Sequence, residues 1–201
     1  MDQQGATVVL RTPHTAPPPN YTPPSMTFLQ GKWHVTHSTL PLWKSKRNVT
    51  ITYKLLEPSD KSIPADQTDR LDDLATYQTL TSDKVMTVHG LNKALDPKRR
   101  DAWGWRGRGL LMVASSHWEI LGSGYEAAES NQHGDSERGE WLVTFFAKTI
   151  VTPAGLDIYS RSKKGLNPIT VQRIENELAK VDNDEIKELA KKLFAVKMFG
   201  D

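Results

Sequence analysis

The segment Val49-Thr50-Ile51-Thr52-Tyr53-Lys54-Leu55 alternates apolar and polar residues. A period of two, carried by β-branched and aromatic side chains, is typical of a strand that is buried on one face only. Similar segments lie on both sides of it, at 31–39, 73–81, 84–90, 102–114, 117–122, 140–150 and 155–160. We therefore expect about eight strands, and we expect them to be antiparallel because their connections are short.

After residue 166 the pattern becomes helical. Asn167 is a good N-cap residue, and Pro168 suits the first helical position. Apolar residues then recur at helical spacing, at Val171, Ile174, Leu178 and Val181. A second helix is predicted from about Asp184 to Met198.

Eight antiparallel strands followed by helices predict a mainly β protein, an up-and-down barrel with C-terminal α-helices. Eight strands leave room inside for one small ligand. An eight-stranded sandwich with the helices on one end is the alternative. We expect the barrel and helices to span 26–201. Residues 1–25, which include Pro17-Pro18-Pro19, are predicted to form a disordered, proline-rich tail.

Composition excludes several classes of function. The chain has 26 Lys and Arg against 24 Asp and Glu, and its net charge of +2 is too small to indicate binding to nucleic acid. It has no cysteine, so disulfides and thiolate chemistry are excluded. With no secretory leader at the start, we expect a cytoplasmic protein. No segment reaches the roughly 20 apolar residues of a membrane span, and the oligomeric state is not predicted.

Two motifs carry a resemblance to a known family. Gly31-Lys32-Trp33 opens the first strand, and Leu156-Asp157-Ile158-Tyr159-Ser160-Arg161 closes the last, just before the first helix. Together they resemble the lipocalin-like (calycin) family. The resemblance implies that Gly31, Trp33 and Arg161 are structural: Trp33 plugs one end of the barrel and Arg161 lies across its ring. A guanidinium on an indole face contributes about 0.5–2 kcal/mol.

The chain also departs from the family. The Thr-Asp-Tyr motif usual near the sixth and seventh strands is missing, as are the leader and the disulfides. The chain is therefore most similar to intracellular fungal lipocalin-like proteins, some of which act as cyclases in natural-product pathways.

The predicted ligand contacts are mostly aromatic. Trp103 and Trp105 share one strand face, and Gly107 and Gly109 continue it, which leaves space for a flat apolar ligand. A cavity wall of indoles is one interpretation, and simple filling of the core is the other. The remaining predicted ligand contacts are Val35 and Phe145.

Four polar residues are candidates for catalysis. If Trp33 points inward, strand parity also turns His37 inward, and Tyr53, His89 and His117 share faces with apolar neighbours. A histidine in an apolar cavity acts as a general acid or base near neutral pH. A structural, hydrogen-bonded role is the alternative for each histidine. No metal site is predicted, because His34 and His37 face opposite sides of one strand, and no cofactor motif occurs.

Three functions remain. In the first, the barrel binds a small, largely apolar metabolite. In the second, the same cavity is a cofactor-free cyclase or isomerase of the pericyclase kind, which folds a polyketide or terpenoid intermediate into its reactive conformation. The third is a protein-interaction module that uses the proline tail. Sequence does not separate carrier from enzyme, because both need an apolar pocket with a few polar groups.

Overall fold

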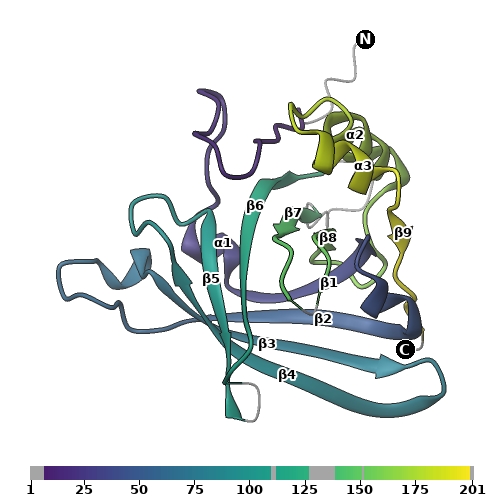
Figure 1. Cartoon of the computed structure of the whole chain (residues 1–201), viewed down its shortest axis with the longest axis horizontal. Helices are drawn as coiled ribbons and strands as arrows, with labels where there is room; N and C mark the ends of the chain where they lie inside the picture. Colours follow the sequence, from purple (N-terminus) through teal and green to yellow (C-terminus); the bar gives the residue numbers. More distant parts are fainter. Residues whose placement is uncertain (1–6, 110–111, 127–138, 151, 200–201) are drawn as a thin grey trace, which may run out of the picture.

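A computed structural model describes residues 7–109, 112–126, 139–150 and 152–199. Eight strands form a closed antiparallel barrel in which each strand pairs with the next, and β1 pairs with both β8 and β2 (Figure 1). The strands are β1 (Gly31–Ser38), β2 (Lys46–Leu55), β3 (Arg70–Thr79), β4 (Ser82–Ala94), β5 (Ala102–Gly107), β6 (Ser115–Tyr125), β7 (Glu140–Phe146) and β8 (Gly155–Ser160). The predicted up-and-down barrel is confirmed, and the sandwich is excluded.

The connections alternate between the two ends of this barrel. Helix α1 (Met26–Leu29), the β2–β3 connection with η2 (Ala65–Gln67) and the β4–β5 connection lie at what we call the closed end. The β1–β2 connection with η1 (Pro41–Ser45) and the β3–β4, β5–β6 and β7–β8 connections lie at the open end. The long β3–β4 hairpin projects at the lower right of Figure 1.

The apolar core has two parts, one inside the barrel and one outside it. The outer part lies between strands β6 to β8 and the helices α2 (Pro168–Leu178) and α3 (Asp184–Ala190). Asn167 caps α2 by accepting a hydrogen bond from the Ile169 N–H, and Ile174 and Leu178 are fully buried. These helices cover the outer face of strand β7, which explains why segment 140–150 is apolar on both faces.

The second helix is shorter than the sequence predicts. It ends at Ala190 instead of Met198, and β9 (Phe194–Ala195) then pairs with β1. Beside it, the Val196 N–H donates to the Thr36 carbonyl at 2.9 Å. Val196 is buried there, so tertiary pairing overrides the local helical pattern.

The proline-rich segment also differs from the predicted disordered tail. Its residues 1–6 lie outside the described residues, but residues 7–25 run along the outside of the barrel and are anchored there. The backbone N–H of Arg11 donates to the Leu121 carbonyl, and the Tyr21 hydroxyl donates to the Ile120 carbonyl at 3.0 Å. Val8 and Tyr21 are each only 8% exposed, so the segment does bury apolar surface.

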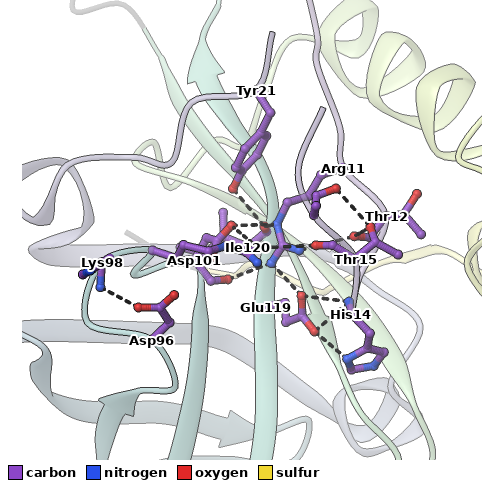
Figure 2. A network of polar contacts seen from close by, with 12 residues as sticks. Arg11, Thr12, His14, Thr15, Tyr21, Asp96, Lys98, Asp101, Glu119 and Ile120 are labelled. Atoms are coloured by element: carbon purple, nitrogen blue, oxygen red, sulfur yellow. Dashed lines mark hydrogen bonds and ion pairs between the residues drawn. The ribbon is translucent and has the colours of Figure 1, made fainter. Parts of the chain in front are cut away.

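A buried ion network holds this segment in place (Figure 2). The side chain of Arg11 is 0% exposed and lies 3.1 Å from the Asp101 carboxylate and 2.6 Å from that of Glu119. Its Nε also donates to the Ile120 carbonyl at 2.9 Å. A buried guanidinium is tolerated only when it is paired and hydrogen-bonded, as it is here. A prediction from composition missed the anchoring because only a few residues, Val8, Arg11 and Tyr21, carry it.

Candidate binding site in the barrel

The closed end is plugged by Trp33. Its indole is 0% exposed and donates to the Leu29 carbonyl at 2.9 Å. The Arg161 guanidinium lies 3.6 Å from the ring centroid and donates to the carbonyls of Phe28, Gln30 and Lys32. Gly31 adopts a φ of 102° directly beneath this guanidinium, where only glycine is unstrained. This is the arrangement that the resemblance implies for Gly31, Trp33 and Arg161.

A β-bulge in β1 corrects the expected position of His37. Trp33 and Val35 point into the barrel, but the register with β8 shifts between Val35 and His37. One extra residue reverses every later side chain. His37 therefore lies outside the barrel, in a shallow groove of about 230 Å³ beside Val171 and Glu175 of α2. Burial lowers its pKa.

The other two candidate histidines are also on the outer face. His89 pairs with Leu74 in the β3–β4 ladder, and its Nε2 lies 2.7 Å from the Asp72 carboxylate. His117 is exposed, one position before the inward-facing Trp118. The structure thus brings none of His37, His89 and His117 into the barrel, and only Tyr53 of the four catalytic candidates lies inside.

Phe145, a predicted ligand contact, belongs to the outer core. It is 1% exposed, and its ring lies edge-on to His14 of the N-terminal segment, with centroids 5.7 Å apart. Its neighbour Phe146 takes the inward position instead. Strand 140–150 is apolar on both faces, so the sequence held no signal for choosing between the two.

The two predicted tryptophans do face the interior. Trp103 is fully buried, and Trp105 is partly exposed next to it on β5. A Cβ at position 90 would overlap the Trp105 indole nitrogen, so Gly90 of the neighbouring strand makes room for this ring. From the sequence we expected Gly107 and Gly109 to leave this space, but the glycine that the Trp105 ring covers is Gly90. Gly107 lies opposite Gly90 in the β4–β5 ladder.

Aromatic rings stack across the interior. Trp118 is the centre of the stack: its ring lies 5.7 Å from Tyr53 at an interplanar angle of 5°, 6.0 Å from Trp103 and 6.3 Å from Phe146. Offset stacking of this kind contributes about 0.5–1.5 kcal/mol per pair beyond burial. The result is a flat, rigid wall of π-faces.

One buried polar chain orients this wall. The Trp118 indole N–H donates to Asn92 Oδ1 at 2.8 Å, and Asn92 Nδ2 donates to the Asp73 carboxyl at 2.9 Å. Desolvation raises the pKa of Asp73 to about 6. Asn92 is 1% exposed, so its hydrogen bonds exist only within the barrel.

A second buried carboxyl lies nearer the open end. Asp157 accepts a hydrogen bond from the Ser38 hydroxyl at 2.5 Å and one from the Trp43 indole at 3.4 Å. Burial raises its pKa to about 7. Tyr53 and Tyr159, which hydrogen-bond to each other, are close enough to both carboxyls for burial and the two negative charges to raise their own pKa values.

Inward-facing side chains differ in their exposure along the barrel. Trp33, Val35, Val49 and Leu71 are each 0% exposed. At the closed end, Phe28 and Leu55 are partly exposed members of the interior core. Toward the open end, the partly exposed members include Tyr77, Val88, Trp105 and Phe146. Three of these four side chains are aromatic, and we call this accessible part of the interior the aromatic mouth.

Apart from Tyr53, sequence reasoning missed the polar residues of the interior. Asp157 and Tyr159 alternate with the apolar Leu156 and Ile158, and the structure turns the apolar pair outward under the helices. Only the helix packing reveals that reversal.

Within the described part of the chain, no three His, Asp or Glu side chains gather as a metal site. None of the described helices has the length and apolar character needed to cross a bilayer.

Comparisons with known proteins show the fold. No family model and no curated protein match the chain. The tryptamine complex of the amine binding protein of Rhodnius prolixus is 11% identical with a TM-score of 0.55, covering 96% of this chain and 86% of that one. Lobster apocrustacyanin A1 is 12% identical with a TM-score of 0.52, covering 88% and 80%. Sequence identities this low do not show a shared function. Together with the closed barrel, however, the structural matches establish that the chain has a lipocalin-like fold.

Proposed function

We propose that the open end of the barrel binds a small, largely apolar molecule. The ligand lies against Trp105 and contacts Tyr77, Val88 and Phe146. The observation that carries this proposal is the exposure of these side chains toward the open end, where their aromatic or branched apolar surface is partly accessible to solvent. Large apolar groups of this kind contribute most when a ligand removes them from water.

The wall behind the mouth supports a flat ligand. Trp105 rests on Gly90, and the stack of Trp103 and Trp118 continues the same wall. Rigid rings lose little conformational entropy on binding, so a planar apolar compound gains affinity from a surface that is already ordered. The amine binding protein has the same fold and is solved with tryptamine, a flat aromatic compound.

The proposal is tested with the neutral fluorescent probe N-phenyl-1-naphthylamine, whose emission rises in apolar surroundings. We expect saturable binding to the full chain. Trp105→Ala should weaken it about tenfold, since most of the contact surface is removed. Trp141→Phe is the matched control, because Trp141 lies in the outer core under the helices. Equal affinities of parent and Trp105→Ala, with both folded by circular dichroism, would contradict the site.

Buried carboxyls favour a second candidate function. With a pKa of about 7, Asp157 is partly protonated at neutral pH, and Trp43 links it to Tyr77 at the mouth with ring centroids 5.9 Å apart. A neutral carboxylic acid in an apolar site donates a proton or hydrogen bond to a carbonyl oxygen. With Tyr53, it would serve a cofactor-free cyclase or isomerase that acts on a polyketide or terpenoid intermediate. A cytoplasmic role like that of the fungal lipocalin-like cyclases fits this candidate.

Product analysis separates the two candidates. Polyketide and terpenoid intermediates are incubated with the protein and recovered for chromatography. A carrier returns each compound unchanged, and Asp157→Asn then alters affinity at most. An enzyme converts one of them, and Asp157→Asn lowers the turnover more than the binding. Tyr53→Phe keeps the stacked ring, so it isolates the contribution of the hydroxyl.

A further inference from the structure

Exposed apolar side chains are concentrated at the open end of the barrel. Seven of the eleven large hydrophobic residues that are exposed in the described chain lie there, in its connections and on the adjoining start of β4. They are Leu42, Leu80, Val85, Met86, Met112, Val113 and Ile150. Isolated exposed apolar residues need no explanation, but a concentration at one end marks an interaction surface.

The most exposed of these residues sit at the tips of connections. Val113 is 97% exposed and Met112 64% in the β5–β6 connection, and Ile150 is 104% exposed in the β7–β8 connection. Leu42, in η1, is 41% exposed. The antiparallel topology brings these connections to the same end, around the aromatic mouth. Because Val113 and Ile150 are almost wholly exposed, their side chains contribute almost nothing to the stability of the fold.

Basic residues accompany the apolar tips. The described residues of the four open-end segments, 39–47, 79–86, 106–109 with 112–114, and 147–150 with 152–154, contain seven Lys and Arg and one acidic residue, Asp83, which forms an ion pair with Arg47. The basic residues are Lys44, Lys46, Arg47, Lys84, Arg106, Arg108 and Lys148. The β2–β3 connection of the closed end, 56–69, has the opposite balance, with four acidic residues and one lysine.

We propose that the open end docks on an anionic lipid surface, with the apolar tips inserted at the level of the headgroups. Basic side chains around apolar ones match the two parts of such a surface, its negative headgroups and its acyl boundary. The tips stand on separate connections around a mouth, a geometry that suits a deformable lipid layer. The mouth then faces the bilayer, and an apolar compound moves between the two without crossing water. This docking goes beyond the proposed ligand binding and does not depend on it.

The first test uses vesicles and the apolar tips. The full chain is sedimented with vesicles of phosphatidylcholine alone and of phosphatidylcholine mixed with phosphatidylserine. We expect binding to the mixed vesicles and little to the neutral ones. The double substitution Val113→Asp and Ile150→Asp should weaken that binding at least about tenfold, because charged side chains do not enter the acyl boundary. Ile169→Asp is the matched control, since Ile169 is 62% exposed on α2, away from the open-end connections.

The second test addresses the charges. Lys44→Glu with Lys148→Glu should weaken binding to the mixed vesicles by about fivefold or more per residue, and added salt should weaken the parent in the same way. Lys61→Glu with Lys98→Glu, in the β2–β3 and β4–β5 connections of the closed end, makes the same change in net charge away from the open end. An equal effect of both pairs would show that only net charge matters and would overturn the docking surface.

Other outcomes also decide the proposal. Failure of the parent to bind the mixed vesicles overturns it. If the parent also dimerises, and Val113→Asp with Ile150→Asp makes it monomeric in sedimentation, the partner of this surface is a second copy of the chain instead of a lipid surface. The naphthylamine titration is run on the same proteins. If vesicle binding is absent but the probe binds, only the docking proposal fails and the proposed ligand function stands. If the vesicles bind but the probe does not, only the proposed ligand function fails.

Discussion

At the closed end, the Arg161 guanidinium lies on Trp33 and donates to three backbone carbonyls and to the Glu140 carboxylate. At the open end, Val113 and Ile150 lie almost wholly in solvent. The first arrangement gives every guanidinium nitrogen of Arg161 an acceptor beside the fully buried Trp33 ring. The second leaves large apolar side chains outside the packed core.

This difference places stabilising contacts and the proposed binding surface at opposite ends of the barrel axis. Burial of Trp33 stabilises the closed half. The open half presents its connections outward around the mouth, and binding residues commonly lie in such connections on a rigid scaffold. Substitutions at the closed end should therefore change the free energy of unfolding, and those at the tips should change binding alone.

The largest effect is expected from Trp33→Ala. Removing a fully buried indole leaves a cavity and the Arg161 guanidinium without its ring, so we expect a loss of about 3–5 kcal/mol. Urea unfolding followed by circular dichroism measures it. Val113→Ser at the open end is the comparison, and its effect should stay within about 0.5 kcal/mol. If the two variants lost similar amounts of unfolding free energy, the proposed difference between the two ends would be wrong.

A smaller but still large effect is expected from Arg11→Ala. The substitution removes the buried guanidinium between Asp101 and Glu119 and leaves each carboxylate with one more exposed partner, Arg99 for Asp101 and His14 for Glu119. Breaking a buried ion pair from one side costs about 3 kcal/mol or more. Urea unfolding measures the loss, and faster proteolysis within residues 7–25 would locate it. Arg47→Ala, whose partner Asp83 is exposed, should cost less than about 1 kcal/mol. If Arg11→Ala unfolds like the parent, the segment is not anchored by this network.

The smallest of the three effects depends on pH. Asp157 has a pKa of about 7 in the fold and about 3.9 when unfolded. Between these values the unfolded chain ionises first, so the parent should lose about 1–3 kcal/mol of stability as the pH rises from 4 to 7. Asp157→Asn removes this contribution and should flatten the profile. Asp73→Asn should flatten only the part up to about pH 6. Urea unfolding at several pH values tests this, and parallel profiles for parent and Asp157→Asn would contradict it.

Much of the fold was readable from local pattern. Alternation around Ile51 predicted strands, and Asn167 with Pro168 marked the start of α2, which begins there. Candidate residues were less predictable because each depends on the face it occupies. Trp103 and Trp105 were placed inside correctly, since no bulge separates them, whereas the bulge after Val35 turned His37 outward.

Eight antiparallel strands and a C-terminal helix follow from local periodicity, because periods of two and of 3.6 are properties of neighbouring residues. The face of each strand that became the interior depends on packing between elements that are distant in the chain. One helix layer over β7 and β8 turned Phe145 and Ile158 outward and left Asp157 and Tyr159 inside. The same holds for Arg11, whose carboxylate partners lie 90 and 108 positions away in the chain. Contacts across such separations leave no periodic trace in the sequence, and they arise only when the barrel closes.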